Sequence, residues 1–334
     1  MDKSKKKKLP RALKALLLFL VILAVIIIFE LISVNYQSNP QKVLAYETSN
    51  PYIAGDEGTQ ISAHRSGGGI APEETMMAFR NCAENSDFTI DWFEFDLHIT
   101  KDDVLVLLHD DTLDRTSDSE TVFGRKDVRP EEMTYEELRT LNMGAKFENE
   151  HGETPYAELS GEEVPDDLRI VRIEDVLDYL QSVNDYNYII EIKNDGELGT
   201  HALDILYGIL SARDLLDNVI FGTFNEEVSL HADANYPDLN RSATIKEVLE
   251  FYTAAITDDE DFKAEYTALQ IPYSMPFRLV ANLGTAEVVN YAHEHNLAVQ
   301  YWTINSEEDF EYLCSLDADC IMTDYPDAMY GYLD

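Results

Sequence analysis

Short apolar runs alternate with amphipathic segments along most of the chain, from residue 59 to the C-terminal end. The apolar runs are rich in β-branched and aromatic residues and are predicted to be strands at residues 59–63, 91–97, 104–109, 186–192, 218–224, 268–272, 297–303 and 320–324. The segments between them carry apolar residues at helical spacing and are predicted to be helices at residues 75–85, 172–183, 201–213, 245–256, 285–296 and 307–316. This alternation predicts an α/β fold, a parallel sheet covered by helices.

Eight or so strand–helix units between residues 59 and 334 favour a TIM (β/α)8 barrel. Residues 239–244 could supply a ninth strand. A doubly wound open sheet is the alternative, but no glycine fingerprint opens a helix after the first strand. Residues 112–168 interrupt the rhythm because they are acidic and rich in loops, with one clear helix at 130–141. They are predicted to form a small insertion beside the mouth of the barrel, where insertions shape the substrate entrance.

The N-terminal segment has a different pattern, a basic cluster followed by an apolar run. Seven Lys and Arg residues precede residue 15, and residues 15–34 are apolar apart from Glu30. About 20 helical residues span the hydrocarbon core of a bilayer, so residues 15–34 are predicted to be a transmembrane signal-anchor helix. The positive-inside rule places residues 1–14 in the cytoplasm and the rest of the chain outside the cell.

This arrangement predicts a single-pass protein of the cell membrane whose main domain is extracellular. Residues 35–58 are polar, contain Pro, Gly and Asn, and are predicted to link the helix to a barrel at 59–334. A cleaved signal peptide is the alternative, because the strictly uncharged stretch covers only residues 15–29. The nearest small residues that could form a cleavage site lie around Ala45, well past that stretch.

Charge excludes one class of function. From residue 15 onward, 18 Lys and Arg face 63 Asp and Glu, a formal balance of −45. Nucleic-acid binding needs a basic surface, so a nucleic-acid partner is not expected. The three cysteines, Cys82, Cys314 and Cys320, show no paired spacing and do not indicate a disulfide framework.

Polar residues stand in or directly after three predicted strands, and these residues are His64 and Arg65, Glu94 and Asp96, and His109 and Asp110. Glu94 and Asp96 are two residues apart, so on a strand they share one face. Two carboxylates held together repel each other unless a cation lies between them. Two histidines can take and give a proton, and an arginine binds an anion. The set predicts metal-assisted cleavage of a phosphate ester.

Three later features extend this set. Glu191 and Lys193 share a face at the end of a predicted strand, where Glu191 could complete a cation site and Lys193 could meet a phosphate oxygen. Residues 67–69 are three glycines that could let the backbone approach an anion, although a flexible turn is an equal explanation. Trp302 closes another strand, where it could wall the pocket or pack in the core.

With these motifs in order, the chain resembles the glycerophosphodiester phosphodiesterase family, and its plan is similar to that of bacterial phosphatidylinositol-specific phospholipases. The matching motifs are AHRSGGGIAPEET, FEFDLHITKDD, VLVLLHDDTLDRTS, TYEELRTL, VRIEDVL, IIEIK, YWTIN and CIMTDYPD. They cover roughly residues 59–330 in the order of the family. Ser66 and Glu74 depart from the family pattern, which usually has Gly and Asn there, and this affects loop geometry and substrate choice.

The resemblance implies a TIM barrel with a divalent cation, Ca²⁺ or Mg²⁺, and assigns roles by position. Glu94, Asp96 and Glu191 would be the metal ligands, and His64 and His109 the general base and the general acid. Arg65 and Lys193 would hold the phosphate, and Trp302 would wall the pocket.

The expected activity is hydrolysis of a small glycerophosphodiester to glycerol 3-phosphate and an alcohol. Lysophospholipids and glycerol-phosphate wall polymers are alternative substrates. A surface binding protein that kept the barrel and lost catalysis is the alternative from another class.

Overall fold

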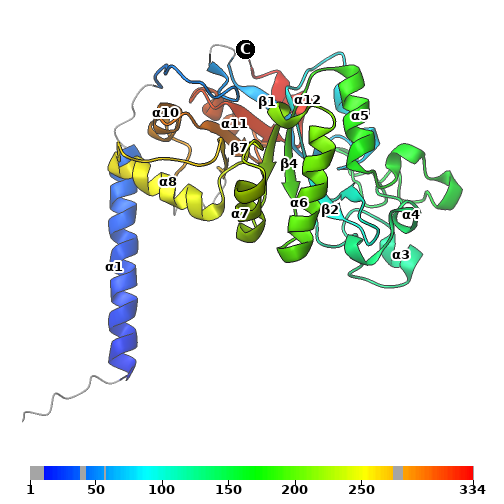
Figure 1. Ribbon diagram of the computed structural model, residues 1–334, viewed down its shortest axis with the longest axis horizontal. Helices are drawn as coiled ribbons and strands as arrows, with labels where there is room; N and C mark the ends of the chain where they lie inside the picture. The colour runs from blue at the N-terminus through cyan, green and yellow to red at the C-terminus, as the bar shows by residue number, and fades with distance from the viewer. Residues whose placement is uncertain (1–10, 38–42, 56–57, 274–280, 334) are drawn as a thin grey trace, which may run out of the picture.

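The computed structural model describes residues 11–37, 43–55, 58–273 and 281–333 (Figure 1). Its centre is a parallel sheet in the order β5-β4-β2-β1-β8-β7-β6 that curls into a nearly closed barrel. The strands are β1 (Gln60–Ala63), β2 (Trp92–Ile99), β4 (Asn187–Ile192), β5 (Val219–Gly222), β6 (Ala268–Pro272), β7 (Ala298–Trp302) and β8 (Cys320–Thr323). The predicted α/β barrel of the TIM type is therefore confirmed.

Residues 240–243 fill the gap between β5 and β6. The Phe221 backbone N–H donates to Asn240 O at 2.8 Å, and the Ala243 N–H donates to Ala268 O at 2.9 Å. Parallel bridges pair Phe221 with Arg241 and Ser242 with Ala268. This short segment, expected as a possible ninth strand, thus takes the eighth position of the barrel.

The segment predicted as a strand at residues 104–109 has a different role. It forms β3 (Leu105–Leu107), which lies antiparallel to the end of β2 and outside the barrel path. A sequence pattern shows that a buried strand exists but not the direction of its partner, so the expectation of parallel pairing fails here.

Helices cover the outside of the barrel and supply its outer core (Figure 1). They are α2 (Met76–Ala83), α5 (Ile173–Val183), α6 (Gly196–Ser211), α7 (Glu226–Asn235), α8 (Ile245–Thr257), α10 (Ala286–Glu294), α11 (Glu307–Cys314) and α12 (Pro326–Tyr330). In α5 the buried residues Ile173, Val176, Leu177 and Leu180 follow helical spacing. The apolar side of α5 thus faces the core of the barrel.

The region of the predicted insertion contains α3 (Ser119–Phe123), α4 (Tyr135–Leu138) and several short turns. It lies at one side of the barrel (Figure 1). Leu113, Val128, Leu138 and Leu141 form a small apolar core there together with Val106 of β3. β3 therefore anchors this region to the end of β2.

The end of the barrel at which the strands begin is closed by residues 43–55, part of the predicted linker. The buried ring of Tyr52 lies 5.5 Å from that of Trp92 at the start of β2. The Tyr52 hydroxyl donates to Asp217 O at 2.8 Å, and the Ala54 N–H donates to Asp319 Oδ1 at 2.9 Å. These contacts make the segment a cap on the inner core.

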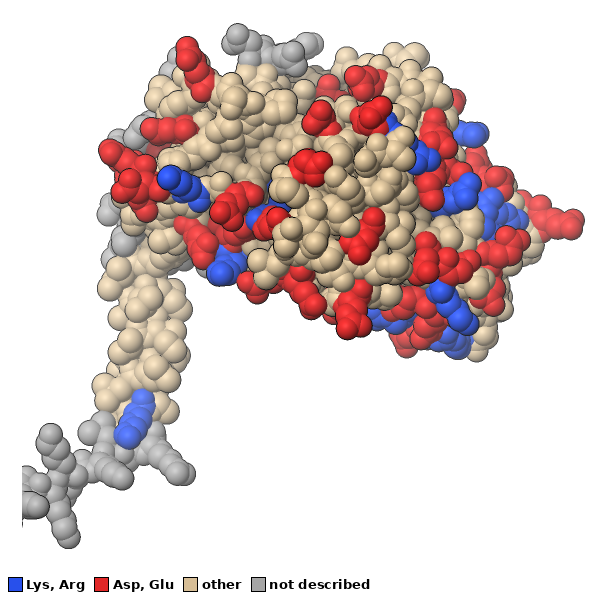
Figure 2. Space-filling view, viewed as in Figure 1, with Lys and Arg blue, Asp and Glu red and all other residues tan. Residues whose placement is uncertain are grey.

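The N-terminal helix α1 (Arg11–Gln37) projects from the barrel (Figure 1). It includes the predicted anchor, and its large apolar side chains from Leu13 to Ile28 are exposed. Figure 2 shows acidic side chains spread over the visible face of the barrel, whereas the described part of α1 is almost entirely uncharged. Over the residues that the structure describes, no helix has both the length and the apolarity needed to cross a membrane.

Arg241 clamps the segment that closes the barrel. It is 5% exposed, and its guanidinium binds Asp233 at 2.6 and 2.9 Å and Glu247 at 2.8 and 2.9 Å. Asp233 belongs to α7 and Glu247 to α8, so one side chain ties both neighbouring helices to residues 240–243.

We expect Arg241→Ala to lower the free energy of unfolding by about 3 kcal/mol, because it leaves the Asp233 and Glu247 carboxylates without their cation and creates a cavity. Urea unfolding followed by circular dichroism measures the change. The control is Arg213→Ala, which removes an ion pair with the exposed Asp178 and should cost under about 1 kcal/mol. An equal loss of unfolding free energy in Arg241→Ala and Arg213→Ala would contradict this stabilising role of Arg241.

Candidate active site

One pocket at the carboxyl ends of the barrel strands contains every site residue predicted from the sequence. It holds about 700 Å³ of empty space, its open mouth included, and its lining includes His64, Arg65, Glu94, Asp96, His109, Glu191, Lys193 and Trp302. These residues span more than 200 positions of the chain. The barrel assembles them because parallel strands end at the same edge.

Alternation along β2 aims two carboxylates into the barrel. Trp92 belongs to the inner core, and Glu94 and Asp96 follow it at intervals of two on the same face. They are 5% and 1% exposed, and Asp96 pairs in register with Glu191 of β4. Three carboxylates on two neighbouring strands therefore share a small, largely dry volume.

Burial makes this arrangement electrostatically costly. Burial, followed by the negative charge of Asp96, raises the pKa of Glu94 to about 7 and that of Glu191 to about 8. Burial also opposes ionisation of Asp96, but Lys193 and other nearby cations outweigh it and lower its pKa. The site thus lacks positive charge for the carboxylates it holds.

Lys193 supplies the positive charge that is present. Its Nζ lies 3.2 Å from Asp96 Oδ1 and 3.0 Å from Glu191 Oε1. Neither Asp96 oxygen accepts a hydrogen bond of good geometry, and both are buried. Buried carboxylate oxygens without donors fit a hard cation such as Ca²⁺ or Mg²⁺.

The predicted ligands do not yet form a coordination group. Across the described ranges, no cluster of three or more His, Cys, Asp or Glu side chains is arranged to hold a metal ion. Glu94 Oε2 instead accepts the Arg65 backbone N–H at 2.7 Å. The donor set is chemically suited to a cation, while its present contacts are with Lys193 and the Arg65 backbone.

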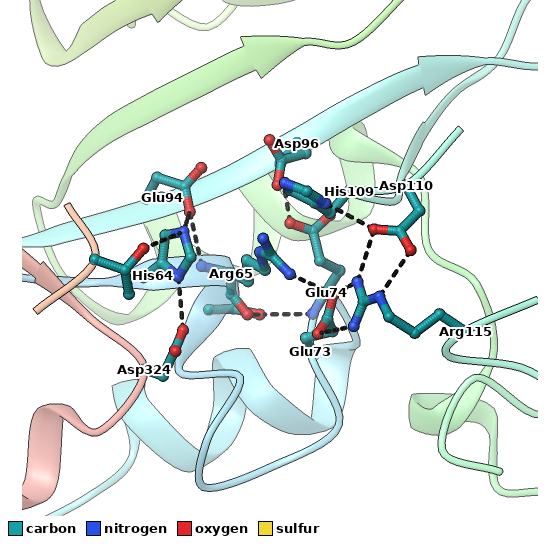
Figure 3. Close-up of polar contacts among 12 residues, drawn as sticks. His64, Arg65, Glu73, Glu74, Glu94, Asp96, His109, Asp110, Arg115 and Asp324 are labelled. Atoms are coloured by element: carbon teal, nitrogen blue, oxygen red, sulfur yellow. Dashed lines mark hydrogen bonds and ion pairs between the residues drawn. The ribbon is translucent and has the colours of Figure 1, made fainter. Parts of the chain in front are cut away.

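Each predicted catalytic histidine is oriented by a carboxylate (Figure 3). His64 Nδ1–H donates to Asp324 Oδ1 at 2.6 Å, and His109 Nδ1–H donates to Asp110 Oδ1 at 2.8 Å. A carboxylate can only accept here, so Nε2 is the ring atom that can exchange a proton with a ligand. In His64 this atom lies 3.3 Å from Thr303 Oγ1 and 3.9 Å from Glu94 Oε2. Asp324 is itself fixed by Asn305 Nδ2 at 2.6 Å.

The two histidines differ in their surroundings. Burial opposes the charged form of His64, but the charges of Glu94 and Asp324 outweigh it and raise its pKa. Burial lowers the pKa of His109 despite the nearby charge of Asp96. Two rings with the same ordinary pKa therefore differ in this pocket, His64 being protonated more readily than His109.

The loop after β1 positions Arg65 without using its glycines as an anion cradle. Gly69 packs so closely on Tyr325 that a Cβ would lie 2.5 Å from the ring, and its N–H donates to Asp324 O at 2.9 Å. A Cβ on Gly67 would meet Cys82 Sγ at 2.7 Å. The glycine triplet therefore serves close packing beside the site.

Phe224 and Trp302 form an apolar wall on the pocket. Their ring centroids lie 6.2 Å apart in an edge-to-face arrangement, and Lys193 Nζ lies 5.9 Å from the centre of the Phe224 ring. The pocket is therefore charged on one side and aromatic on the other.

Comparison with known proteins agrees with this geometry. Residues 64–328 match the model of the glycerophosphoryl diester phosphodiesterase family. The chain belongs to this family. It is thus a phosphoric diester hydrolase whose family acts on glycerophosphodiesters.

Among its relatives is a glycerophosphodiester phosphodiesterase of Caldanaerobacter subterraneus subsp. tengcongensis, 26% identical over 81% of this chain and 96% of that protein. Human lysophospholipase D GDPD3 is 26% identical over 82% of this chain and 85% of that protein. A solved Oleispira antarctica phosphodiesterase, in complex with the product sn-glycerol-3-phosphate, has a TM-score of 0.58 at 20% identity and covers 83% of this chain and 98% of that one. The likeness to that structure supports the barrel fold.

Three residues that support the site of this phosphodiesterase, Asp324, Arg115 and Glu74, had no role predicted from the sequence pattern. Asp324 ends a predicted strand, which was an available signal. Arg115 and the buried Glu74 carried no such signal, because both lie in loops. Glu74 Oε1 accepts the Asp96 backbone N–H at 3.0 Å and so supports β2 from beneath.

Arg115 links the two halves of the phosphodiesterase site (Figure 3). Its guanidinium binds Asp110 at 2.7 and 3.0 Å and Glu73 at 2.6 and 2.8 Å. Asp110 orients His109, and Glu73 Oε1 lies 3.4 Å from Arg65 Nη1. A residue at the start of the insertion thus holds the partners of a histidine and of an arginine.

We expect Arg115→Ala to lower kcat/KM on a glycerophosphodiester about 10-fold or more, since supporting contacts of this kind are typically worth 10- to 100-fold. Steady-state kinetics, with circular dichroism to check folding, measures the effect. Arg125→Ala is the matched control, because Arg125 pairs with the exposed Glu132 away from the pocket. Wild-type kinetics in Arg115→Ala would contradict the link.

Proposed function

We propose that this enzyme hydrolyses a glycerophosphodiester to glycerol 3-phosphate and an alcohol, using a divalent cation and two histidines. The observation that carries the proposal is the pair of carboxylate-oriented histidines in one pocket with three buried carboxylates. The number of titratable groups gathered there is far more than packing requires.

Arg65 and Lys193 hold the phosphate, since both cations line the pocket. His64 Nε2 takes the proton of the substrate's attacking glycerol hydroxyl as its oxygen bonds to phosphorus. His109 Nε2 gives a proton to the oxygen of the departing alcohol as its bond to phosphorus breaks. Water then opens the cyclic phosphate with the two histidine roles reversed. This two-step route follows the family resemblance.

Glu94, Asp96 and Glu191 would hold Ca²⁺ or Mg²⁺, which fits the buried Asp96 oxygens, neither of which accepts a hydrogen bond of good geometry. A bound cation would neutralise charge on the phosphate and favour ionisation of the attacking hydroxyl. Lys193, released from its carboxylate partners, would then be free to meet the phosphate.

His109→Ala should reduce turnover of glycerophosphocholine by a factor of about 100 or more, because it removes the proton donor. Removing the cation with a chelator should abolish turnover, and adding Ca²⁺ or Mg²⁺ back should restore it. Both are measured by the release of choline. His201→Ala is the control, because His201 is exposed and pairs with Asp103 outside the pocket.

Unchanged turnover in His109→Ala would remove the role assigned to that ring. Full activity after chelation would rule out the role proposed for the cation.

We also propose that the apolar segment at residues 15–34, predicted from the sequence to be an anchor, tethers the enzyme to the cell membrane, with residues 1–14 in the cytoplasm and the barrel outside. The exposed apolar side chains from Leu13 to Ile28 support this, because such a surface is costly in water. The basic cluster on the N-terminal side supports the orientation.

The full chain should remain in the membrane fraction after carbonate extraction, and its barrel should be accessible to protease added outside intact cells. Mass spectrometry of the extracted protein should find residues before Ala15. A mature N-terminus near Ala45 and release into the medium would instead support the cleaved signal peptide.

A further inference from the structure

Two glutamine side chains pair inside the barrel, on the neighbouring strands β6 and β7. Gln270 lines the active-site pocket, whereas Gln300, which lies opposite it in the strand register, is fully buried. Gln270 Nε2 donates to Gln300 Oε1 at 3.0 Å. Gln300 therefore holds the amide of Gln270 in place, although a glutamine side chain loses much rotamer freedom when it is fixed.

The pocket leaves space beside this amide. Gly222 of β5 also lines the pocket, and a Cβ at that position would lie 3.2 Å from Gln270 Oε1 and 3.5 Å from Ser242 Oγ. A side chain at residue 222 would fill the space that these two polar atoms border. The glycine thus leaves a small polar recess, bordered by Gln270 and Ser242, at the wall of the pocket.

The buried amide of Gln300 indicates which group this recess would bind. Within the described ranges, Gln300 Nε2 is buried and has no hydrogen-bond partner. The two amides can also pair with Gln300 Nε2 donating to Gln270 Oε1, which turns Gln270 Nε2 toward the recess. A hydroxyl can accept or donate, so it satisfies Gln270 in both arrangements, whereas a carbonyl or an ammonium group satisfies only one.

The barrel places this recess on the glycerol side of the proposed reaction. Thr303 directly follows β7, and its Oγ1 lies 3.3 Å from His64 Nε2, the atom proposed to take the proton of the attacking hydroxyl. Gln270 lies on β6, the neighbour of β7 in the sheet. His109 instead comes shortly after β3, which pairs with the end of β2. The glycerol therefore lies toward Gln270, and the departing alcohol lies toward His109.

We propose that Gln270 is a specificity-determining residue that recognises the second free hydroxyl of the substrate's glycerol. This inference rests on the proposed function and narrows its substrates to diesters whose glycerol carries two free hydroxyls. One hydroxyl attacks phosphorus, and the other binds Gln270 beside Gly222. Gln300 is a positioning residue, because it acts through Gln270.

The test compares glycerophosphocholine with its 1-deoxy analogue, the phosphocholine ester of the primary hydroxyl of propane-1,2-diol. The analogue keeps the attacking hydroxyl and the choline leaving group and lacks only the hydroxyl assigned to Gln270. We expect the kcat/KM of the wild-type full chain to be about 10-fold or more higher for glycerophosphocholine, because the analogue leaves a buried amide unpaired. Choline release measures both rates.

Gln270→Met should lower kcat/KM for glycerophosphocholine about 10-fold and leave that for the analogue unchanged, because it removes the amide and keeps a side chain of similar length. Gln181→Met is the matched control, since Gln181 is exposed on α5 and donates to Arg213 O at 3.3 Å outside the pocket. Circular dichroism checks the folding of each variant. If Gln270→Met does not fold, Gln300→Met should narrow the same ratio between the two substrates.

The outcomes separate this inference from the function on which it rests. Equal wild-type kcat/KM for the two substrates would overturn the recognition of the hydroxyl and leave the proposed function standing. An equal loss on both substrates in Gln270→Met would show that the residue only supports the barrel, and an unchanged ratio would also overturn its assigned role. No turnover of either substrate by the wild-type enzyme would overturn both proposals.

Discussion

The confinement of Glu94, Asp96 and Glu191 to one largely buried volume is the constraint on which the rest of the site depends. Burial raises the pKa of Glu94 and of Glu191, and Asp96 stays ionised only with help from nearby cations. Charge compensation therefore has to be built around them. The chain itself supplies two compensating contacts. Lys193 lies between Asp96 and Glu191, and the Arg65 backbone N–H donates to Glu94. The divalent cation proposed for this site would supply the remaining positive charge.

The barrel can hold these buried carboxylates because the rest of its interior is apolar and closed. Below the carboxylates, Trp92, Ile189 and Ile220 fill the inner core, and Tyr52 caps it. In the gap between β5 and β6, residues 240–243 form a bridge to each strand. Arg241 in this segment forms ion pairs with Asp233 and Glu247. Strand alternation then leaves only the upper layer of inward positions for charged residues.

Much of this arrangement could be predicted from the sequence, and the remainder has identifiable physical causes. Strand ends located His64, Glu94, His109, Glu191 and Lys193, because periodicity marks strands and parallel strands end together. The antiparallel direction of β3 could not be predicted, since a short apolar run does not indicate which strand it pairs with or in which orientation. Residues 240–243 form only two bridges, too few for a clear pattern. Arg115 acts through contacts with Glu73 and Asp110 that are distant in sequence or lie in loops.

Ser66 and Glu74 show how the loop after β1 keeps its shape. Both have positive φ, 60° and 59°, where residues with a Cβ are strained by about 1 kcal/mol or more. Ser66 Oγ donates to Arg65 O at 2.6 Å and accepts the Glu74 N–H at 3.1 Å, so the side chain that adds strain also adds hydrogen bonds. Glu74 in turn accepts the Asp96 N–H beneath the site. The hydrogen bonds of Ser66 and Glu74 therefore support the loop beside the residues that line the pocket.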